Sequence, residues 1–351
     1  MKKLCIPLSV LLSLTVLLSA CGRKTAENPS VTSVYDDAAN VALSGSAETT
    51  GQASAFSETA TSTSASRAET TTQPQTSAIP ETAVTEASTS STASEPTSSA
   101  PTGQFEVRQL NAERDGLSIY GNLYRPTDPG KNLPAVILSH SANMTSDSMK
   151  SYCERIAKMG FVAYSFDFCG GSTESRSSGK PNDMTVFTEV EDLKAVLQMI
   201  KGLDFVDKQN IFLFGTSQGG LVSALTAADD PDGIKGLLLF YPAFNIPDAV
   251  QKYAKVMPRG SLSPYITTLL DYDVYEHIKP YKGDVLIVHG TTDFVVPYTY
   301  SEKAAEVYEN CEIHPVTGGT HGFNADNYVS FGDFDRKTWV FAERFLKEHC
   351  K

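Results

Sequence analysis

The sequence lacks the features that bind nucleic acid or a metal ion. Its 351 residues contain 41 Asp and Glu against 29 Lys and Arg. Acidic residues outnumber basic ones by 9 to 5 over residues 1–103 and by 32 to 24 over residues 104–351. Nucleic-acid-binding proteins present basic surfaces, so this balance argues against nucleic acid as a partner. The six cysteines have no CxxC or other metal-ligand spacing, and we expect neither a metal nor a cofactor.

Large apolar residues are scarce in one long segment near the N-terminus. Between Val41 and Ala100, 28 of the 60 residues are Ser or Thr. Such a segment cannot bury enough surface to offset the entropy that is lost on folding. We therefore predict a disordered tether over residues 21–103. Residues 104–351 are enough for one domain with a large core.

The apolar stretch at the N-terminus is too short for a membrane-spanning helix. Lys2 and Lys3 precede apolar residues 4–18, which Pro7 and three hydroxyl residues interrupt, whereas a span needs about 20 apolar residues. Leu18-Ser-Ala-Cys21 follows, a pattern typical of bacterial lipoprotein signals. We predict a signal peptide over residues 1–20 and a lipidated Cys21 that anchors the protein on the extracytoplasmic face of the cell membrane. The alternative is an ordinary signal peptide with a chance cysteine.

Short apolar runs alternate with helical patterns through residues 104–351. Phe105 to Pro126 predicts an antiparallel hairpin that turns at Arg114-Asp115-Gly116. Six later runs are typical of strands buried on both faces of a parallel sheet; they cover residues 135–138, 161–166, 211–214, 237–240, 285–288 and 311–316. Helical spacing covers residues 190–200, 219–228 and 335–348. The sequence therefore predicts an α/β fold with helices on both faces of a mostly parallel sheet.

The segment 245–282, between the fourth and fifth runs, has no strand pattern. We predict a small lid over the carboxyl edge of the sheet, where ligands of such folds bind. Its tyrosines are candidates either for substrate contact or for the core; they are Tyr253, Tyr265, Tyr272, Tyr275 and Tyr281.

One predicted strand runs directly into Gly215-Thr-Ser217-Gln-Gly219 and then into a helix. This is the G-x-S-x-G motif in its strand–turn–helix context, in which the serine is a nucleophile. The turn is too sharp for side chains at Gly215 and Gly219. The helix N-terminus directs N–H groups and the positive end of its dipole toward Ser217. We predict Ser217 as the nucleophile.

A serine nucleophile needs a base and a residue that orients the base. Asp293 follows the run 285–288, and His321 follows the run 311–316, in the chain order Ser, Asp, His that such sites share. We predict His321 as the general base and Asp293 as the acid that orients it. His289 and His314 lie within strand patterns and are expected to be structural.

The developing oxyanion needs two N–H donors. Gln218, directly after the nucleophile, is expected to supply one. The other is expected from the loop after residues 135–138, where Ala142 takes the donor position.

Residues 104–351 resemble the α/β-hydrolase superfamily and, within it, the bacterial cinnamoyl/feruloyl esterases. Besides the motifs above, the resemblance rests on Ser165-Phe-Asp-Phe, Gly170-Gly-Ser, Asp183-Met-Thr-Val, Glu189-Val-Glu-Asp192, the segment 285–298 and the segment 314–323. It implies an α/β-hydrolase fold with a short lid, an ester hydrolase without cofactor, and Asp167 as a loop organiser. Family members usually carry His-Gly before the oxyanion donor, whereas this chain has His140-Ser141.

Together these inferences predict a cell-surface serine esterase. Its expected substrate is a small ester or an ester-decorated polysaccharide, with hydroxycinnamoyl esters first. One alternative is a serine aminopeptidase-like enzyme, whose free-amine substrate could bind acidic lid residues; the candidates are Asp248, Asp271, Asp273 and Glu276. The other is a catalytically inactive surface binding lipoprotein. For the four cysteines of residues 104–351, the expectation is free or partly paired thiols; they are Cys153, Cys169, Cys311 and Cys350.

Overall fold

The computed structural model describes residues 104–127, 132–258, 260–323 and 331–350. The predicted signal peptide (1–20), the lipidated Cys21 and the tether (21–103) lie outside the described residues. Within the described ranges, no helix is long and apolar enough to cross a membrane.

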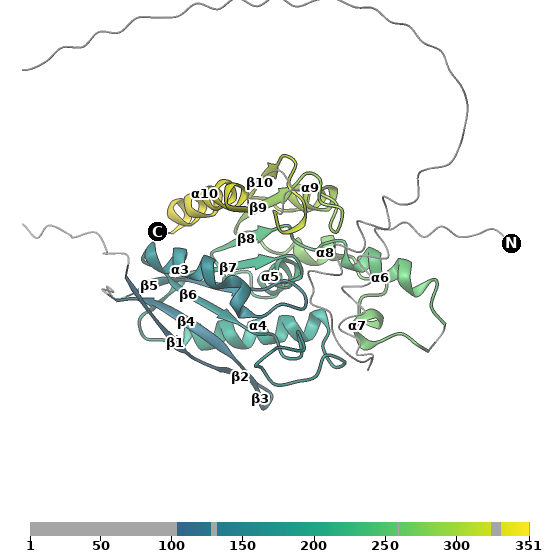
Figure 1. Ribbon diagram of the computed structural model, residues 1–351, viewed down its shortest axis with the longest axis horizontal. Helices are drawn as coiled ribbons and strands as arrows, with labels where there is room; N and C mark the ends of the chain where they lie inside the picture. Colours follow the sequence, from purple (N-terminus) through teal and green to yellow (C-terminus); the bar gives the residue numbers. More distant parts are fainter. Residues whose placement is uncertain (1–103, 128–131, 259, 324–330, 351) are drawn as a thin grey trace, which may run out of the picture. The chain divides into compact units, whose positions relative to one another are not determined.

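Among these residues, eight strands form one sheet in the order β1-β4-β6-β5-β7-β8-β9-β10, and β2 pairs with β3 in a separate hairpin. The six strands from β6 to β10 in this order are parallel, while β4 is antiparallel to both β1 and β6 (Figure 1). The bounds are β1 (Phe105–Gln109), β2 (Ala112–Arg114), β3 (Leu117–Ile119), β4 (Gly121–Pro126), β5 (Leu133–Ser139), β6 (Val162–Phe166), β7 (Val206–Thr216), β8 (Gly236–Phe240), β9 (Asp284–Gly290) and β10 (Cys311–Val316).

Helices connect most of these strands. Their bounds are η1 (Ser146–Met149), α3 (Lys150–Lys158), α4 (Val186–Lys201), α5 (Gln218–Asp229), α6 (Ile246–Ala254), α7 (Pro264–Thr267), α8 (Val274–Ile278), α9 (Thr299–Val307), η2 (His321–Phe323) and α10 (Phe331–His349).

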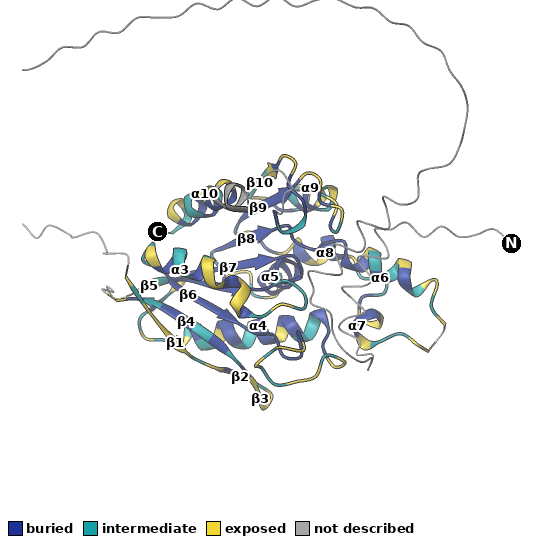
Figure 2. Ribbon diagram, viewed as in Figure 1, coloured by how far each residue is buried: buried dark blue, intermediate teal, exposed yellow. Residues whose placement is uncertain are grey.

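The central strands are buried on both faces because helices cover both. Along β5, Ala135 and Ile137 face one core, to which α4, α5 and α9 contribute. Val136 and Leu138 face a second core, to which α3 and α10 contribute. Figure 2 shows the strands as largely buried ribbons between helices that are partly exposed. This double burial explains why the strand sequences are continuous apolar runs, and the predicted α/β fold with a mostly parallel sheet is confirmed.

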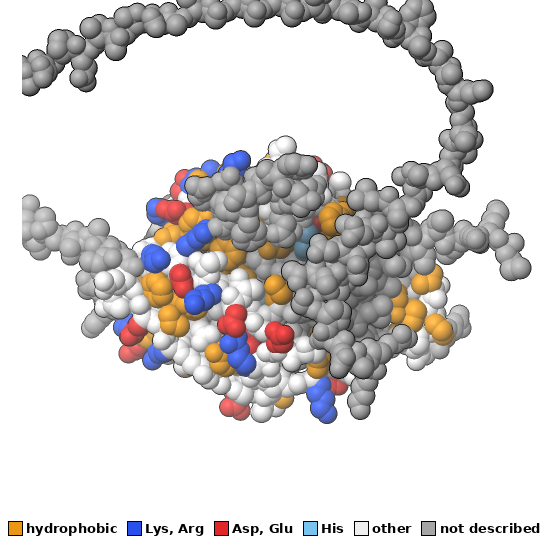
Figure 3. All heavy atoms as spheres, in the orientation of Figure 1, with side chains coloured by type: hydrophobic (Ala, Val, Ile, Leu, Met, Phe, Trp, Pro, Cys, Tyr) orange, Lys and Arg blue, Asp and Glu red, His pale blue; other side chains and the backbone are white. Residues whose placement is uncertain are grey.

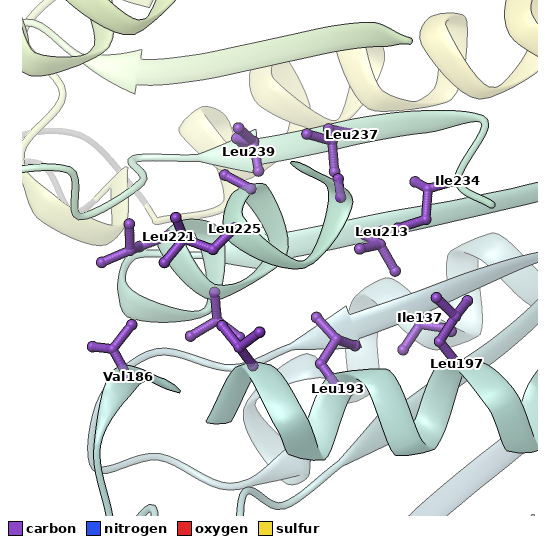
Figure 4. Close-up of a cluster of buried hydrophobic side chains, with 14 of the residues drawn as sticks. Ile137, Val186, Leu193, Leu197, Leu213, Leu221, Leu225, Ile234, Leu237 and Leu239 are labelled. Atoms are coloured by element: carbon purple, nitrogen blue, oxygen red, sulfur yellow. The ribbon is translucent and has the colours of Figure 1, made fainter. Parts of the chain in front are cut away.

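The first core holds α4 and α5 against the sheet. Helix α4 begins after Thr185, whose side chain accepts the Thr188 N–H while the Thr188 hydroxyl accepts the Thr185 N–H. Figure 4 shows Leu193 and Leu197 of α4 beside the side chains of the sheet and of α5. This packing holds the N-terminus of α5, where the G-x-S-x-G motif lies.

The predicted hairpin over residues 105–126 is present but divided. β1 pairs with β4, and β2 pairs with β3 in the same register, so the tip belongs to a separate two-stranded sheet. Asp115 and Gly116 turn the chain with φ of 50° and 78°, as a two-residue hairpin turn requires.

Three short helices, α6, α7 and α8, occupy the segment 245–282 between β8 and β9. The Asn245 side chain donates to the Val295 carbonyl at 2.8 Å at one end, and the Tyr281 hydroxyl donates to the Ile234 carbonyl at 3.1 Å at the other. Both ends of the segment are therefore held to the parallel-sheet domain.

The four cysteines of the domain are free in the structure: Cys153, Cys169, Cys311 and Cys350. On the face drawn in Figure 3, acidic and basic side chains are interspersed.

Candidate active site

The G-x-S-x-G motif forms a sharp turn between β7 and α5. Ser217 has φ 50° and ψ −118°, a strained backbone for a residue with a side chain. A Cβ at Gly215 would lie 2.2 Å from the Gly219 carbonyl oxygen, and a Cβ at Gly219 would lie 2.3 Å from the Ser139 carbonyl oxygen. Both glycines are thus required by close backbone approach.

Four backbone hydrogen bonds hold the strained serine in place. Its N–H donates to the Phe240 carbonyl at 3.0 Å. Its carbonyl accepts the N–H groups of Gly220, Leu221 and Ala243 at 3.0, 3.3 and 2.9 Å. β8, the loop after it and the first turn of α5 therefore hold this strained backbone in place.

The structure brings Ser217, His321 and Asp293 into one hydrogen-bonded series. His321 Nε2 lies 3.1 Å from Ser217 Oγ, and His321 Nδ1 lies 2.7 Å from Asp293 Oδ2. The Asp293 side chain is fully buried, whereas that of His321 is 23% exposed. The Tyr241 ring packs edge-on against the imidazole at a centroid distance of 4.9 Å. This geometry lets the imidazole take a proton from the serine hydroxyl while the carboxylate stabilises the resulting charge.

Asp293 is held as a carboxylate by donors on both oxygens. Oδ1 accepts the N–H groups of Val295 and Val296, both at 2.9 Å, and Oδ2 accepts from His321 and from His289 Nε2, the latter at 3.1 Å. Burial alone raises the pKa of Asp293, but the hydrogen bonds from His289, His321 and Val296 outweigh it and hold the pKa well below its usual range.

His289 is the site residue that sequence reasoning assigned too small a role. It is buried, as expected, but it also contacts Asp293. Nε2 faces two acceptors, Asp293 Oδ2 and the Val296 carbonyl at 2.9 Å, while Nδ1 lies 2.7 Å from Ser301 Oγ. Nε2 therefore carries a proton for these two acceptors, while Nδ1 pairs with the Ser301 hydroxyl. Its spacing of four residues from Asp293 at a strand end was the available signal.

The two expected oxyanion donors lie on elements that meet at the nucleophile. Gln218 is the first residue of α5. Ala142 follows β5, whose last residue, Ser139, is in register with Gly215 of β7. The Ser141 hydroxyl lies 2.9 Å from Thr216 Oγ1 and joins this loop to the residue before Ser217. Ser141, in place of the usual glycine, is thus accommodated, and Asn143 takes the positive φ of 58° in this turn.

Asp167 organises the segment that follows this loop. Its carboxylate accepts the N–H groups of Ser146 and Arg176 and the Arg176 guanidinium, at 2.8 to 2.9 Å. Burial raises the pKa of Asp167, but these hydrogen bonds bring it below its ordinary value. His140 is also buried, and its Nε2 accepts the Phe168 N–H at 3.3 Å. Burial lowers the pKa of His140, so this imidazole is neutral and joins the two loops.

The remaining histidines lie in other contacts. His314 contacts Glu312 and Arg344, His277 stacks on Tyr272, and His349 pairs with Asp284. In the part of the chain that the structure describes, no group of three or more His, Cys, Asp or Glu residues could hold a metal ion.

Known proteins share the fold on which this site is built. Residues 130–271 match the family model described as serine aminopeptidase, S33. The structure of Est1E from Butyrivibrio proteoclasticus with ferulic acid bound matches with a TM-score of 0.59 at 26% identity; the match covers 69% of this chain and 100% of that one. The chain has the α/β-hydrolase fold.

Two relatives match this chain over shorter segments. The α/β hydrolase domain-containing protein WAV2 of Arabidopsis thaliana is 26% identical over 188 residues, which cover 50% of this chain and 59% of that one. The quorum-quenching protein AidA of Acinetobacter baumannii is 29% identical over 253 residues, which cover 56% of this chain and 82% of that one. The chain thus spans 59% of the length of WAV2, which is less than two thirds.

Proposed function

We propose that this protein is a serine esterase that hydrolyses carboxylic esters through an acyl-enzyme. The observation that carries the proposal is the hydrogen-bonded series from Ser217 Oγ through His321 to Asp293. The strained turn at Ser217, at the N-terminus of α5, supports it further.

In the proposed reaction, Ser217 Oγ attacks the ester carbonyl carbon while His321 Nε2 accepts the hydroxyl proton. The N–H groups of Gln218 and Ala142 stabilise the oxyanion. The carbon–oxygen bond to the alcohol then breaks, and His321 returns the proton to the leaving oxygen. Water attacks the acyl-enzyme with His321 again as base, which releases the acid and restores Ser217.

The proposed substrates are hydroxycinnamoyl esters, free or attached to a polysaccharide. The similarity to Est1E, whose structure contains ferulic acid, supports this class. Of the five tyrosines in the segment 245–282, four are buried in the first core and Tyr272 packs against it.

The esterase proposal is tested by a hydrolysis panel on the full-length protein and its Ser217→Ala variant. We expect the wild type to hydrolyse p-nitrophenyl acetate and methyl ferulate, and the variant to hydrolyse neither. A fluorophosphonate probe should label the wild type alone. A well-folded wild type that is neither labelled nor active would favour the inactive binding protein.

The description of the matching family model favours a second candidate function, that of an aminopeptidase. A cavity of about 480 Å³ is lined in part by Asp248, Asp271 and Asp273, which could attract a free amine. Two of the three carboxylates already have partners, since Asp248 accepts the Tyr300 hydroxyl and Asp273 caps α8. An aminoacyl anilide in the same panel separates the candidates: turnover of the anilide without ester turnover would exclude the esterase.

We also propose that the enzyme is held outside the cell membrane by lipid on Cys21. The support is the pattern Leu18-Ser-Ala-Cys21 after an apolar stretch. Cell fractionation of the wild type and Cys21→Ser tests this anchor: the wild type should sediment with membranes and the variant should not. Equal membrane association of both would contradict it.

A further inference from the structure

Three buried side chains from three elements form a hydrogen-bonded chain beside the nucleophile. The Gln218 side chain donates from Nε2 to Glu189 Oε2 at 2.7 Å, and its Oε1 accepts the Tyr265 hydroxyl at 2.8 Å. Glu189 is 1% exposed, Gln218 4% and Tyr265 5%. These hydrogen bonds therefore join α4 and α5 to α7, the middle helix between β8 and β9.

These side-chain hydrogen bonds are not needed to hold the backbone next to Ser217. The strained turn already has four backbone hydrogen bonds, and α5 continues from it for twelve residues. Helix α7, by contrast, has only four residues, fewer than an isolated helix needs for stability. Its buried residues are Tyr265 and Ile266, so α7 depends on these two side chains for its position.

We propose that Tyr265 is a specificity-determining residue for the reaction proposed above: Gln218, itself held by Glu189, accepts its hydroxyl, and this contact fixes α7 beside the residue that follows Ser217, where α7 bounds the acyl group. Its hydroxyl proton points to Gln218 Oε1, so it is not offered to a substrate. In this proposal, a bulky acyl group packs against Tyr265, whose position is fixed. A small acyl group such as acetyl does not extend to α7.

The test compares three esters on the full-length wild type and Tyr265→Phe. Methyl ferulate and methyl cinnamate both have bulky acyl groups, but only ferulate has a phenol; p-nitrophenyl acetate has neither. We expect kcat/KM to fall by roughly 3- to 10-fold for both bulky esters, mainly through KM, because uniform binding of the acyl group is weakened. The values for p-nitrophenyl acetate should stay unchanged.

Tyr275→Phe is the matched control. This residue of the same segment is also buried, and its hydroxyl donates to the Tyr300 carbonyl at 3.2 Å, not to Gln218. It should lose no discrimination between bulky and small esters. Glu189→Leu is a second variant, since leucine removes the acceptor of the Gln218 Nε2 hydrogen bond; it should repeat the pattern of Tyr265→Phe.

Each other outcome overturns the proposal. A loss for ferulate alone would mean that Tyr265 binds the phenol directly. An equal loss for all three esters would mean that it supports the catalytic groups, and no change would mean that α7 does not depend on it. A wild type that hydrolyses none of the esters would instead contradict the proposed function.

A second measurement does not depend on activity. Amide hydrogen exchange over residues 260–270 should be faster in Tyr265→Phe than in the wild type and in Tyr275→Phe. Unchanged exchange in Tyr265→Phe would contradict the proposed contact even if the protein hydrolyses other substrates.

Discussion

At the residue scale, the chemistry depends on how each ionisable group is partnered. Asp293 is completely buried, yet it stays ionised because two imidazoles and two N–H groups donate to it. Glu189 is equally buried but has one donor, from Gln218, and burial raises its pKa to about 8. Two buried carboxyl groups of one protein therefore differ in charge near neutral pH because their donors differ in number.

His289→Leu should slow catalysis although His289 does not reach the substrate. The substitution removes one of the two imidazole donors to Asp293 and leaves Ser301 and the Val296 carbonyl without this partner. We expect kcat for p-nitrophenyl acetate to fall about 10- to 100-fold with little change in KM, as for a lost hydrogen bond to a charged group. Ser301→Ala, which removes only the far contact, is the control and should lose less. An unchanged kcat in a folded His289→Leu protein would show that Asp293 keeps its position and charge without His289.

Glu189→Gln should change how stability depends on pH. Folding raises the pKa of Glu189 from 4.5 to about 8, chiefly through burial and also through Asp192, while the Gln218 bond lowers it. Between these values the folded state holds a proton that the unfolded state has released, so stability falls as pH rises from 4.5 to about 8.

Glutamine has no such proton. The variant should therefore gain at least about 1 kcal/mol relative to the wild type between pH 5 and pH 8, measured by denaturant unfolding. Glu191→Gln, on the exposed side of the same helix, is the matched control. Parallel stability curves for wild type and Glu189→Gln would refute the shift.

At the scale of elements, the site is built where strand ends and a helix N-terminus meet. β5, β7, β8 and β9 are adjacent and parallel, so their carboxyl ends lie along one edge. The loops after β5, β7, β9 and β10 contribute Ala142, Ser217, Asp293 and His321 in turn. The end of β7, the start of α5 and the end of β5 approach one another so closely only because Gly215 and Gly219 lack side chains.

Gly219→Ala should damage both fold and activity. The new Cβ would lie 2.3 Å from the Ser139 carbonyl oxygen and 2.5 Å from that of His140, so β5 or α5 has to move. We expect a loss of about 3 kcal/mol in the free energy of unfolding, together with a large fall in kcat. Gly202→Ala is the control: Gly202 caps α4 with φ −78°, which alanine adopts freely, and it should cost under about 1 kcal/mol. Equal stability of both variants would contradict the close approach.

At the scale of the whole molecule, the described domain relies on its core and not on covalent links. All four of its cysteines are free, and burial raises the pKa of the Cys153 and Cys169 thiols to about 12. Such thiols are unreactive. We expect a reducing agent to leave the melting temperature unchanged. A lower melting temperature under reducing conditions would reveal a disulfide.

The sequence alone predicted much of this molecule because its signals are local. Buried parallel strands need continuous apolar runs, so the runs at 135–138 and 285–288 identified their strands. A sharp strand–turn–helix connection needs glycines close to the turn, so the five residues from Gly215 to Gly219 predicted the turn at Ser217.

The sequence determined the alternation of strands and helices, the strained turn at Ser217, and the order in which Asp293 and His321 follow it. Only the tertiary structure decided the contacts between distant residues. It turned His289 toward Asp293, joined Glu189, Gln218 and Tyr265 across three elements, and detached the tip of the first hairpin from the main sheet. These contacts depend on the packing of helices from different parts of the chain, and no local pattern encodes the direction in which a buried polar side chain finds its partner.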